Sequence, residues 1–392
     1  MPAKKSARPA RPAATGRTPR SQQPHNKSPQ KKSAQKKPAP KKPAQKKPAQ
    51  RPGARPTRRE PAGEVVLGSV PKVTRLVGGL GLVGGLLLAV AVLLPHLAVG
   101  EEKVVAGESV ATVLVSWIWP LVVILAGISV VLGRYPRFGL AAVGVAGAVS
   151  VAGLFAELYW ASDSAARGRY EIIAGRRLLT SDVEPLAGWY LGVAGLTALV
   201  LAGIGVAWVW SQVVMDDSES LDPGRPALGG LAAISGVAAV LSLSATLVQI
   251  PDQVTVRQQP IAGALRPVET PIPVEGAIGL FDRPGLALIA ALVLSGVLVL
   301  FSVFATTLRP RLAVVGALAA FAGYVLALAA RGLVDAARSD QIETTVGGWG
   351  LFVAGLAYAG LTILAWRWKP PVRAITRGLP MRPASRRALK KG

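Results

Sequence analysis

The chain has 392 residues, with 45 basic against 21 acidic side chains and a formal net charge of +24. It has no cysteine and only two histidines, His25 and His96, which excludes disulfides, thiolate metal sites and cysteine nucleophiles. A histidine-based metal or haem site is not expected either, and no cofactor is predicted. Most basic residues lie before Arg75 or after Arg367, so the apolar body between these tails is close to neutral.

Residues 1–65 form a tail rich in Lys, Pro, Ala and Gln, which is too poor in large apolar side chains to bury a core. We expect a disordered segment, extended by its prolines and by charge repulsion. Such a tail can bind the anionic headgroups of a membrane, or nucleic acid or an acidic protein, or it can simply enforce topology. The lysine pairs that would make these contacts are Lys31, Lys32, Lys36, Lys37, Lys41, Lys42, Lys46 and Lys47.

Eight long apolar runs follow the tail, each long enough to cross the hydrocarbon core of a bilayer as a helix. The chain is therefore predicted to be an all-α, polytopic membrane protein. The predicted spans are Leu76–Leu97, Val110–Leu132, Gly139–Trp160, Gly188–Trp210, Ala227–Ile250, Gly285–Thr306, Leu312–Leu333 and Gly348–Trp368.

We expect the protein to lie in the plasma membrane. Both tails are basic, so the positive-inside rule predicts that both termini are cytoplasmic. An even number of spans satisfies this. Trp117 and Trp119 fit the expected interfacial belts of aromatic residues less well than the other tryptophans do. In the outer segment before the sixth span, the strand-like residues Val254, Thr255 and Val256 favour a small hairpin.

The sequence of the apolar body indicates an internal duplication. Residues 188–196 are GWYLGVAGL and residues 348–356 are GWGLFVAGL, which share seven of nine positions. Four spans in each half give both halves the same orientation, so the repeat is predicted to be parallel, with its axis along the membrane normal. The predicted organisation is a tail at 1–65, repeats at 66–226 and 227–368, and a basic cytoplasmic tail at 369–392.

Each half resembles the four-span actinobacterial membrane proteins described as tryptophan-operon-associated. The resemblance rests on a basic turn before the third span, Arg134 to Arg137 or Arg309 to Arg311, and on the Gly-Trp opening of the fourth. It covers the body and not the tail. It implies a membrane protein without an assigned chemistry.

Two charged residues lie near span ends, Glu157 and Arg331, each 20 residues after a basic turn residue, Arg137 or Arg311. Because 20 helical residues rise about 30 Å, both are expected at the outer boundary of the membrane. Three roles stay open for them: separate interfacial residues, a structural pair across the repeats, or a ligand site.

Glycines one helical turn apart are candidates for close helix packing, within the chain or between copies or partner proteins. These residues are Gly81, Gly85, Gly188 and Gly192.

The sequence carries no catalytic signature, so the leading hypothesis is a non-enzymatic scaffold or accessory subunit with a polybasic tail. The first alternative is a transporter or lipid-handling protein with a cavity between the repeats, whose polar candidates are Ser242, Ser244, Thr246 and Ser302. The second alternative is a transferase for lipid-linked substrates. It rests on the acidic pair Glu101 and Glu102 in the first outer loop.

Overall fold

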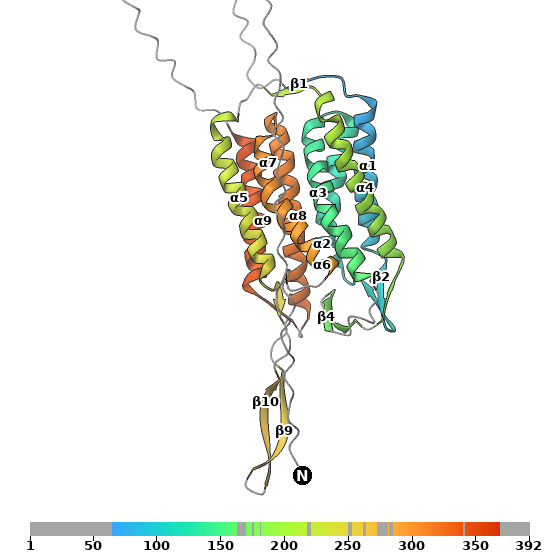
Figure 1. The fold of residues 1–392 in the computed structure, drawn as a ribbon, viewed down its shortest axis with the longest axis vertical. Coiled ribbons are helices and arrows are strands. Elements are labelled where there is room, and N and C mark those ends of the chain that lie inside the picture. The colour runs from blue at the N-terminus through green and yellow to red at the C-terminus, as the bar shows by residue number, and fades with distance from the viewer. Residues whose placement is uncertain are drawn as a thin grey trace, which may run out of the picture. The chain divides into compact units, whose positions relative to one another are not determined.

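A computed structural model defines the fold (Figure 1). The structure describes residues 65–162, 170–174, 176–180, 182–217, 221–249, 253–261, 264–272, 281, 285–339 and 342–368. Residues 1–64 and 369–392, which hold the predicted basic tails, lie outside the described residues, so the prediction of disorder there stays a prediction.

Eight helices in the described ranges are long and apolar enough to cross a membrane, as the hydrophobic runs predict. The sixth is continuous through three helical pieces, with a π-helical turn in its middle. The helices are α1 (Lys72–Ala91), α2 (Val110–Leu132), α3 (Pro136–Trp160), α4 (Ala187–Val209), α5 (Arg225–Ser244), α6 with η4 and α7 (Leu286–Gly296, Val297–Phe301, Ser302–Thr307), α8 (Arg311–Arg338) and α9 (Val346–Arg367).

The helix limits follow local capping chemistry. The hydroxyl of Ser109 accepts from the backbone N–H of Thr112 in a capping box at the start of α2, and Gly133 ends α2 in the left-handed conformation. Residues 110–132 were predicted with these same limits. The predicted first span, by contrast, extends too far, because α1 ends at Ala91 and the chain from Pro95 forms a strand.

Short strands join the helices and were mostly not predicted, so the fold is mostly helical with small sheets in its loops. β2 (Pro95–Val99) pairs with β3 (Glu102–Val105) and β6 (Val183–Pro185), while β8 (Val248–Gln249) pairs with β11 (Glu343–Thr344). The remaining pairs are β1 (Val65–Leu67) with β7 (Met215–Asp217), β4 (Tyr170–Ile173) with β5 (Arg176–Leu179), and β9 (Gln253–Ile261) with β10 (Ala264–Ile272). The last pair is the hairpin that the sequence favours between the fifth and sixth spans.

The helices form two groups of four spans, which we call the first half (α1 to α4) and the second half (α5 to α9), visible side by side in Figure 1. In the first half α1 packs on α2 and α4, and α3 packs on α2 and α4. In the second half α5 packs on α7 and α9, and α8 packs on α7 and α9. The main helix contacts between the halves are α3 with α8, α2 with α8, and α3 with α6.

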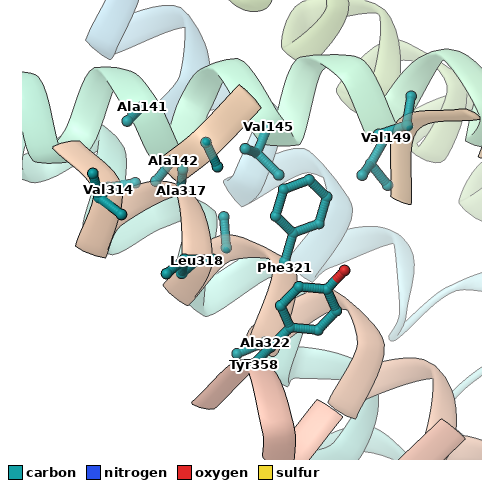
Figure 2. Close-up of a cluster of buried hydrophobic side chains, with 14 of the residues drawn as sticks. Ala141, Ala142, Val145, Val149, Val314, Ala317, Leu318, Phe321, Ala322 and Tyr358 are labelled. Carbon is teal, nitrogen blue, oxygen red and sulfur yellow. The ribbon is translucent and has the colours of Figure 1, made fainter. Parts of the chain in front are cut away.

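The central contact of α3 with α8 holds much of the buried core (Figure 2). Small residues such as Ala141 and Ala317 alternate with Phe321, which is fully buried and stacks on Tyr358 of α9 at 5.5 Å between ring centroids. Gly316 meets α3 so closely that a Cβ there would lie 2.1 Å from the carbonyl oxygen of Phe138. The two halves therefore join through tightly packed backbones.

We call the end of the bundle that carries β1 and the last residues of α9 the tail end, and the end that carries β2, β6, β8 and β11 the loop end. At the tail end, Arg137 donates to the carbonyl oxygen of Val213 at 2.9 and 2.7 Å and to that of Arg309 at 2.7 Å. Its guanidinium also lies 5.4 Å from the ring centre of Trp210. This arginine therefore ties both halves together.

Candidate functional site: a cavity between the halves

A cavity of about 570 Å³ opens between the two halves toward the loop end. Helices α1 to α5 and α8, together with strands β2, β4, β5 and β8, contribute to its lining. The first alternative hypothesis from the sequence called for a cavity between the repeats, and the volume of this cavity is within the range typical of small-molecule sites.

The deep part of the cavity is apolar and aromatic. Trp119 of α2 and Tyr324 of α8 both line it and meet edge to face, with ring centroids 5.2 Å apart. Leu88 of α1, Leu196 of α4 and Leu328 of α8 line it as well. Along α8 the distance from Tyr324 to Asp335 is about 16 Å at the helical rise, so the cavity lines about 16 Å of that helix close to its loop end.

Charged residues gather at the loop end of the cavity. The Oε2 atom of Glu157 lies 2.9 Å from Nε2 of His96, and each side chain keeps 22% of its surface exposed. His96 stands on β2 and Glu157 in the last turn of α3. The indole N–H of Trp189 donates to the backbone carbonyl of Glu157 at 3.0 Å, which fixes this turn against α4.

The carboxylate of Glu171 is buried in the same wall and accepts a hydrogen bond from the hydroxyl of Tyr159 at 3.0 Å. Glu171 belongs to β4, and Arg177 of β5 lines the cavity beside it. The β4–β5 hairpin thus covers one side of the cavity with both an acid and a base.

Arg331 and Asp335 line the cavity from α8, one helical turn apart. Neither makes a hydrogen bond or an ion pair with another described residue. They nevertheless lie near enough for their charges to interact. The cavity therefore holds one cation and one anion that no described side chain neutralises by direct contact.

Two hydroxyls in the cavity wall lack partners among the described residues. The Oγ atoms of Ser116 on α2 and Ser150 on α3 are buried without a hydrogen bond, and only 1% of the surface of Ser150 is exposed. Both residues line the cavity. Because a buried hydroxyl without a partner costs free energy, these two groups mark where a bound molecule or water can accept a hydrogen bond.

A second hollow, also about 570 Å³, lies outside the first and shares Arg177 and Asp335 with it. Its rim is held by ion pairs from Arg176 to Glu102 and, at 3.2 Å, to Glu108. Glu102 is one of the two acids on which the transferase hypothesis rests. Within the described residues there is no group of three or more acidic, histidine or cysteine side chains that could hold a metal ion.

The structure brings Glu157 and Arg331 to the same cavity, but Glu157 contacts His96 and not Arg331. The sequence alone had no reason to choose His96, because that residue was expected inside the first span. Trp119 did carry a signal: it fitted the aromatic belts poorly, and it lies in the cavity floor instead.

The predicted packing glycines lie at contacts within the chain. A Cβ on Gly81 would lie 3.1 Å from the side chain of Val143, and one on Gly85 would lie 2.9 Å from Ile124. One on Gly188 would lie 2.8 Å from the carbonyl oxygens of Leu94 and Pro95, and one on Gly192 would lie 3.5 Å from His96.

Of the four polar residues proposed for a cavity, only Thr246 lines it. Ser302 is buried and bonds to Leu298 and Tyr358 in the second half, and Ser244 is bonded to the carbonyl of Leu241 at 2.7 Å. The lysine pairs of the basic tail lie outside the described residues, so their binding to anionic surfaces stays a prediction.

Comparison with known proteins finds no matching family model, no matching curated protein and no matching solved structure. The resemblance to tryptophan-operon-associated membrane proteins therefore stays a prediction, and the function is inferred from the site itself.

Proposed function

We propose that this chain is a lipid-handling protein of the plasma membrane that holds an amphiphile in the cavity between its halves. One observation carries the proposal: the cavity runs from the aromatic floor of Trp119 and Tyr324 to the charged groups around Arg331 and Asp335. This is the same order of polarity as in one leaflet of a bilayer. A lipid can therefore occupy the cavity without turning its headgroup through the hydrocarbon core.

The repeat is part of the proposal, and the packing of the helices supports it. When the four spans of each half are numbered in chain order, the contact of α2 with α8 and the contact of α6 with α3 both join a second span to the third span of the other half. In the same way, the strand pair β2–β6 after the first span corresponds to β8–β11 after the fifth. Both correspondences are those of a parallel repeat, with α3 and α8 next to its axis.

The orientation follows from charge. Arg134, Arg137, Arg309 and Arg311 lie in the short turns at the tail end, together with acids such as Asp222, which count little in the positive-inside rule. The positive-inside rule thus places the tail end, with both termini, in the cytoplasm. The cavity then lies in the outer leaflet, and the hollow beyond it faces the outside.

The physical chemistry of such a site differs from that of a soluble lipid carrier. Moving acyl chains from a bilayer into an apolar cavity gains little free energy, because lipid tails are as apolar as leucine side chains. The affinity must then come from the charged loop end and from the unpartnered hydroxyls of Ser116 and Ser150, which favour ester carbonyl acceptors. The apolar floor sets which molecules fit, and the polar groups decide which of them stay.

Photo-crosslinking in lipid nanodiscs tests this function. The probe is a phospholipid with a diazirine in its acyl chain, and adducts are mapped by mass spectrometry. We expect adducts on the cavity residues Leu196 and Leu328, in addition to the outward-facing Leu121 and Leu125 that any bilayer lipid reaches. Adducts confined to outward-facing residues would contradict the proposal.

A matched pair of variants separates the cavity from the bilayer. Ala327 lines the cavity, whereas Ala330 on the same helix does not. Ala327→Phe should remove the adducts on Leu196 and Leu328 and leave those on Leu121, and Ala330→Phe should change neither set. The adduct on Leu121 shows that each variant is folded and embedded in lipid.

A further inference from the structure

Two charged side chains of the cavity, Arg331 and Asp335, have no direct partner among the described residues. We infer that the cavity selects a lipid whose headgroup is a phosphate linked to a primary ammonium, with the phosphate at Arg331 and the ammonium at Asp335. The inference rests on the proposed function, since it names the class of lipid that the same cavity binds.

The two other carboxylates of the cavity, Glu157 and Glu171, already have partners within the protein and therefore need no ligand. The Glu157 carboxylate contacts His96 at 2.9 Å, and the Glu171 carboxylate accepts from Tyr159 at 3.0 Å. Arg331 and Asp335 make no such contact with another described residue, although both line the cavity. One group of each sign is thus left for a ligand.

The order of these groups along α8 matches the order of groups in the proposed lipid. Tyr324 lies deepest, Arg331 follows two turns nearer the loop end, and Asp335 lies one turn further, where the cavity meets the outer hollow. Residues four apart on a helix have Cβ atoms about 6 Å apart, close enough for one zwitterionic headgroup to bridge them. Acyl chains, phosphate and ammonium then follow each other outward as they do in the leaflet.

The two charges also distinguish this headgroup from its common alternatives. The phosphate of phosphatidylglycerol can pair with Arg331, but this lipid has no cationic group that could pair with Asp335. A phosphatidylcholine carries the positive charge, but its trimethylammonium has no N–H to donate to the carboxylate. Phosphatidylethanolamine supplies both a phosphate acceptor and an ammonium donor, and hydrogen bonds between charged groups are the stronger kind.

The experiment uses the full chain in nanodiscs that contain equal amounts of phosphatidylethanolamine, phosphatidylglycerol and phosphatidylcholine. After transfer into mild detergent, the lipids that stay bound are measured by mass spectrometry. We expect phosphatidylethanolamine to be enriched about tenfold over each of the others, the effect of one charged hydrogen bond. An enrichment of either other lipid, or of none, would overturn the inference.

Two variants assign the preference to the two residues. Asp335→Asn should abolish the preference for phosphatidylethanolamine over phosphatidylglycerol, and Arg331→Gln should lower the retention of all three lipids. The controls Asp182→Asn and Lys103→Gln remove one charge of each sign from exposed loop-end positions that line neither the cavity nor the outer hollow, and they should keep the wild-type pattern. A preference that survives Asp335→Asn would overturn the inference, even if the wild-type protein shows it.

Two further arms separate the remaining outcomes. Water-soluble glycerophosphoethanolamine should fail to displace the bound lipid; displacement at equal concentration would show that the site takes a free zwitterion instead. The variant Ala327→Phe tests the underlying function. If it leaves lipid retention unchanged, the cavity does not hold lipid at all, whereas loss of retention without a headgroup preference contradicts the headgroup assignment alone.

Discussion

His96 and Glu157 meet at 2.9 Å although 61 residues separate them in the chain. The contact joins the strand that follows α1 to the last turn of α3 and forms one wall of the cavity. It also bears on the interpretation of Glu157, because one of its three predicted roles was a structural pair with Arg331.

A double-mutant cycle distinguishes these two partners. We expect His96→Ala and Glu157→Ala to be coupled by about 1 kcal/mol in the free energy of unfolding, because either change removes the same hydrogen bond. Glu157→Gln and Arg331→Gln should be additive within about 0.5 kcal/mol. The measurement is a denaturant titration in mild detergent. Coupling of Glu157 to Arg331 and not to His96 would contradict the contact between Glu157 and His96.

The guanidinium of Arg137 should be a major contributor to the joining of the halves at the tail end. Arg137→Gln loses hydrogen bonds to the carbonyl oxygens of both Val213 and Arg309, which we expect to cost about 2 kcal/mol or more in the free energy of unfolding. Arg134→Gln, an exposed position in the same turn, should cost less than about 0.5 kcal/mol. Equal effects of the two substitutions in a thermal or denaturant melt would contradict this role.

Gly316 should be needed for the close approach of α3 and α8. Gly316→Ala places a Cβ against the backbone of Phe138 and should destabilise the protein by about 1–3 kcal/mol, as overpacking of a core does. Gly360→Ala is the matched control, because nothing lies within 4 Å of its added Cβ. That change should be neutral or stabilise by about 0.5–1 kcal/mol through helix propensity.

Much of the fold could be predicted from the sequence, because length and apolarity determine which segments can cross a bilayer. All eight spans were predicted, and residues 110–132 with the limits that α2 has. The helix rise also placed Glu157 and Arg331 at the same end of the bundle. These are local properties, which a single sequence contains.

The lining of the cavity could not be predicted, because it depends on which side chains meet across helices distant in the chain. His96 was assigned to the first span, but Pro95 begins β2 and brings the imidazole to Glu157. Asp335 was not predicted as a site residue, because it lies beyond Leu333, where the predicted seventh span ends, although α8 continues to Arg338. Three of the four hydroxyl residues proposed for the cavity lie elsewhere, because a sequence does not reveal which way a uniformly apolar helix is turned.

The orientation is testable because the chain has no native cysteine, so single cysteines can be labelled cleanly. In intact cells, a maleimide that cannot cross the membrane should label the Lys103→Cys variant at the loop end. It should leave the Arg134→Cys variant at the tail end unlabelled until the cells are opened. Labelling in the reverse pattern would place the cavity in the cytoplasmic leaflet and both termini outside.

The most direct measurement is an experimental structure of the full chain in nanodiscs of phosphatidylethanolamine and phosphatidylglycerol. Our account predicts continuous density in the cavity, with its headgroup between Arg331 and Asp335 and its chains reaching Trp119 and Tyr324. A cavity that holds only water, or one closed by side chains moving together across the halves, would contradict it.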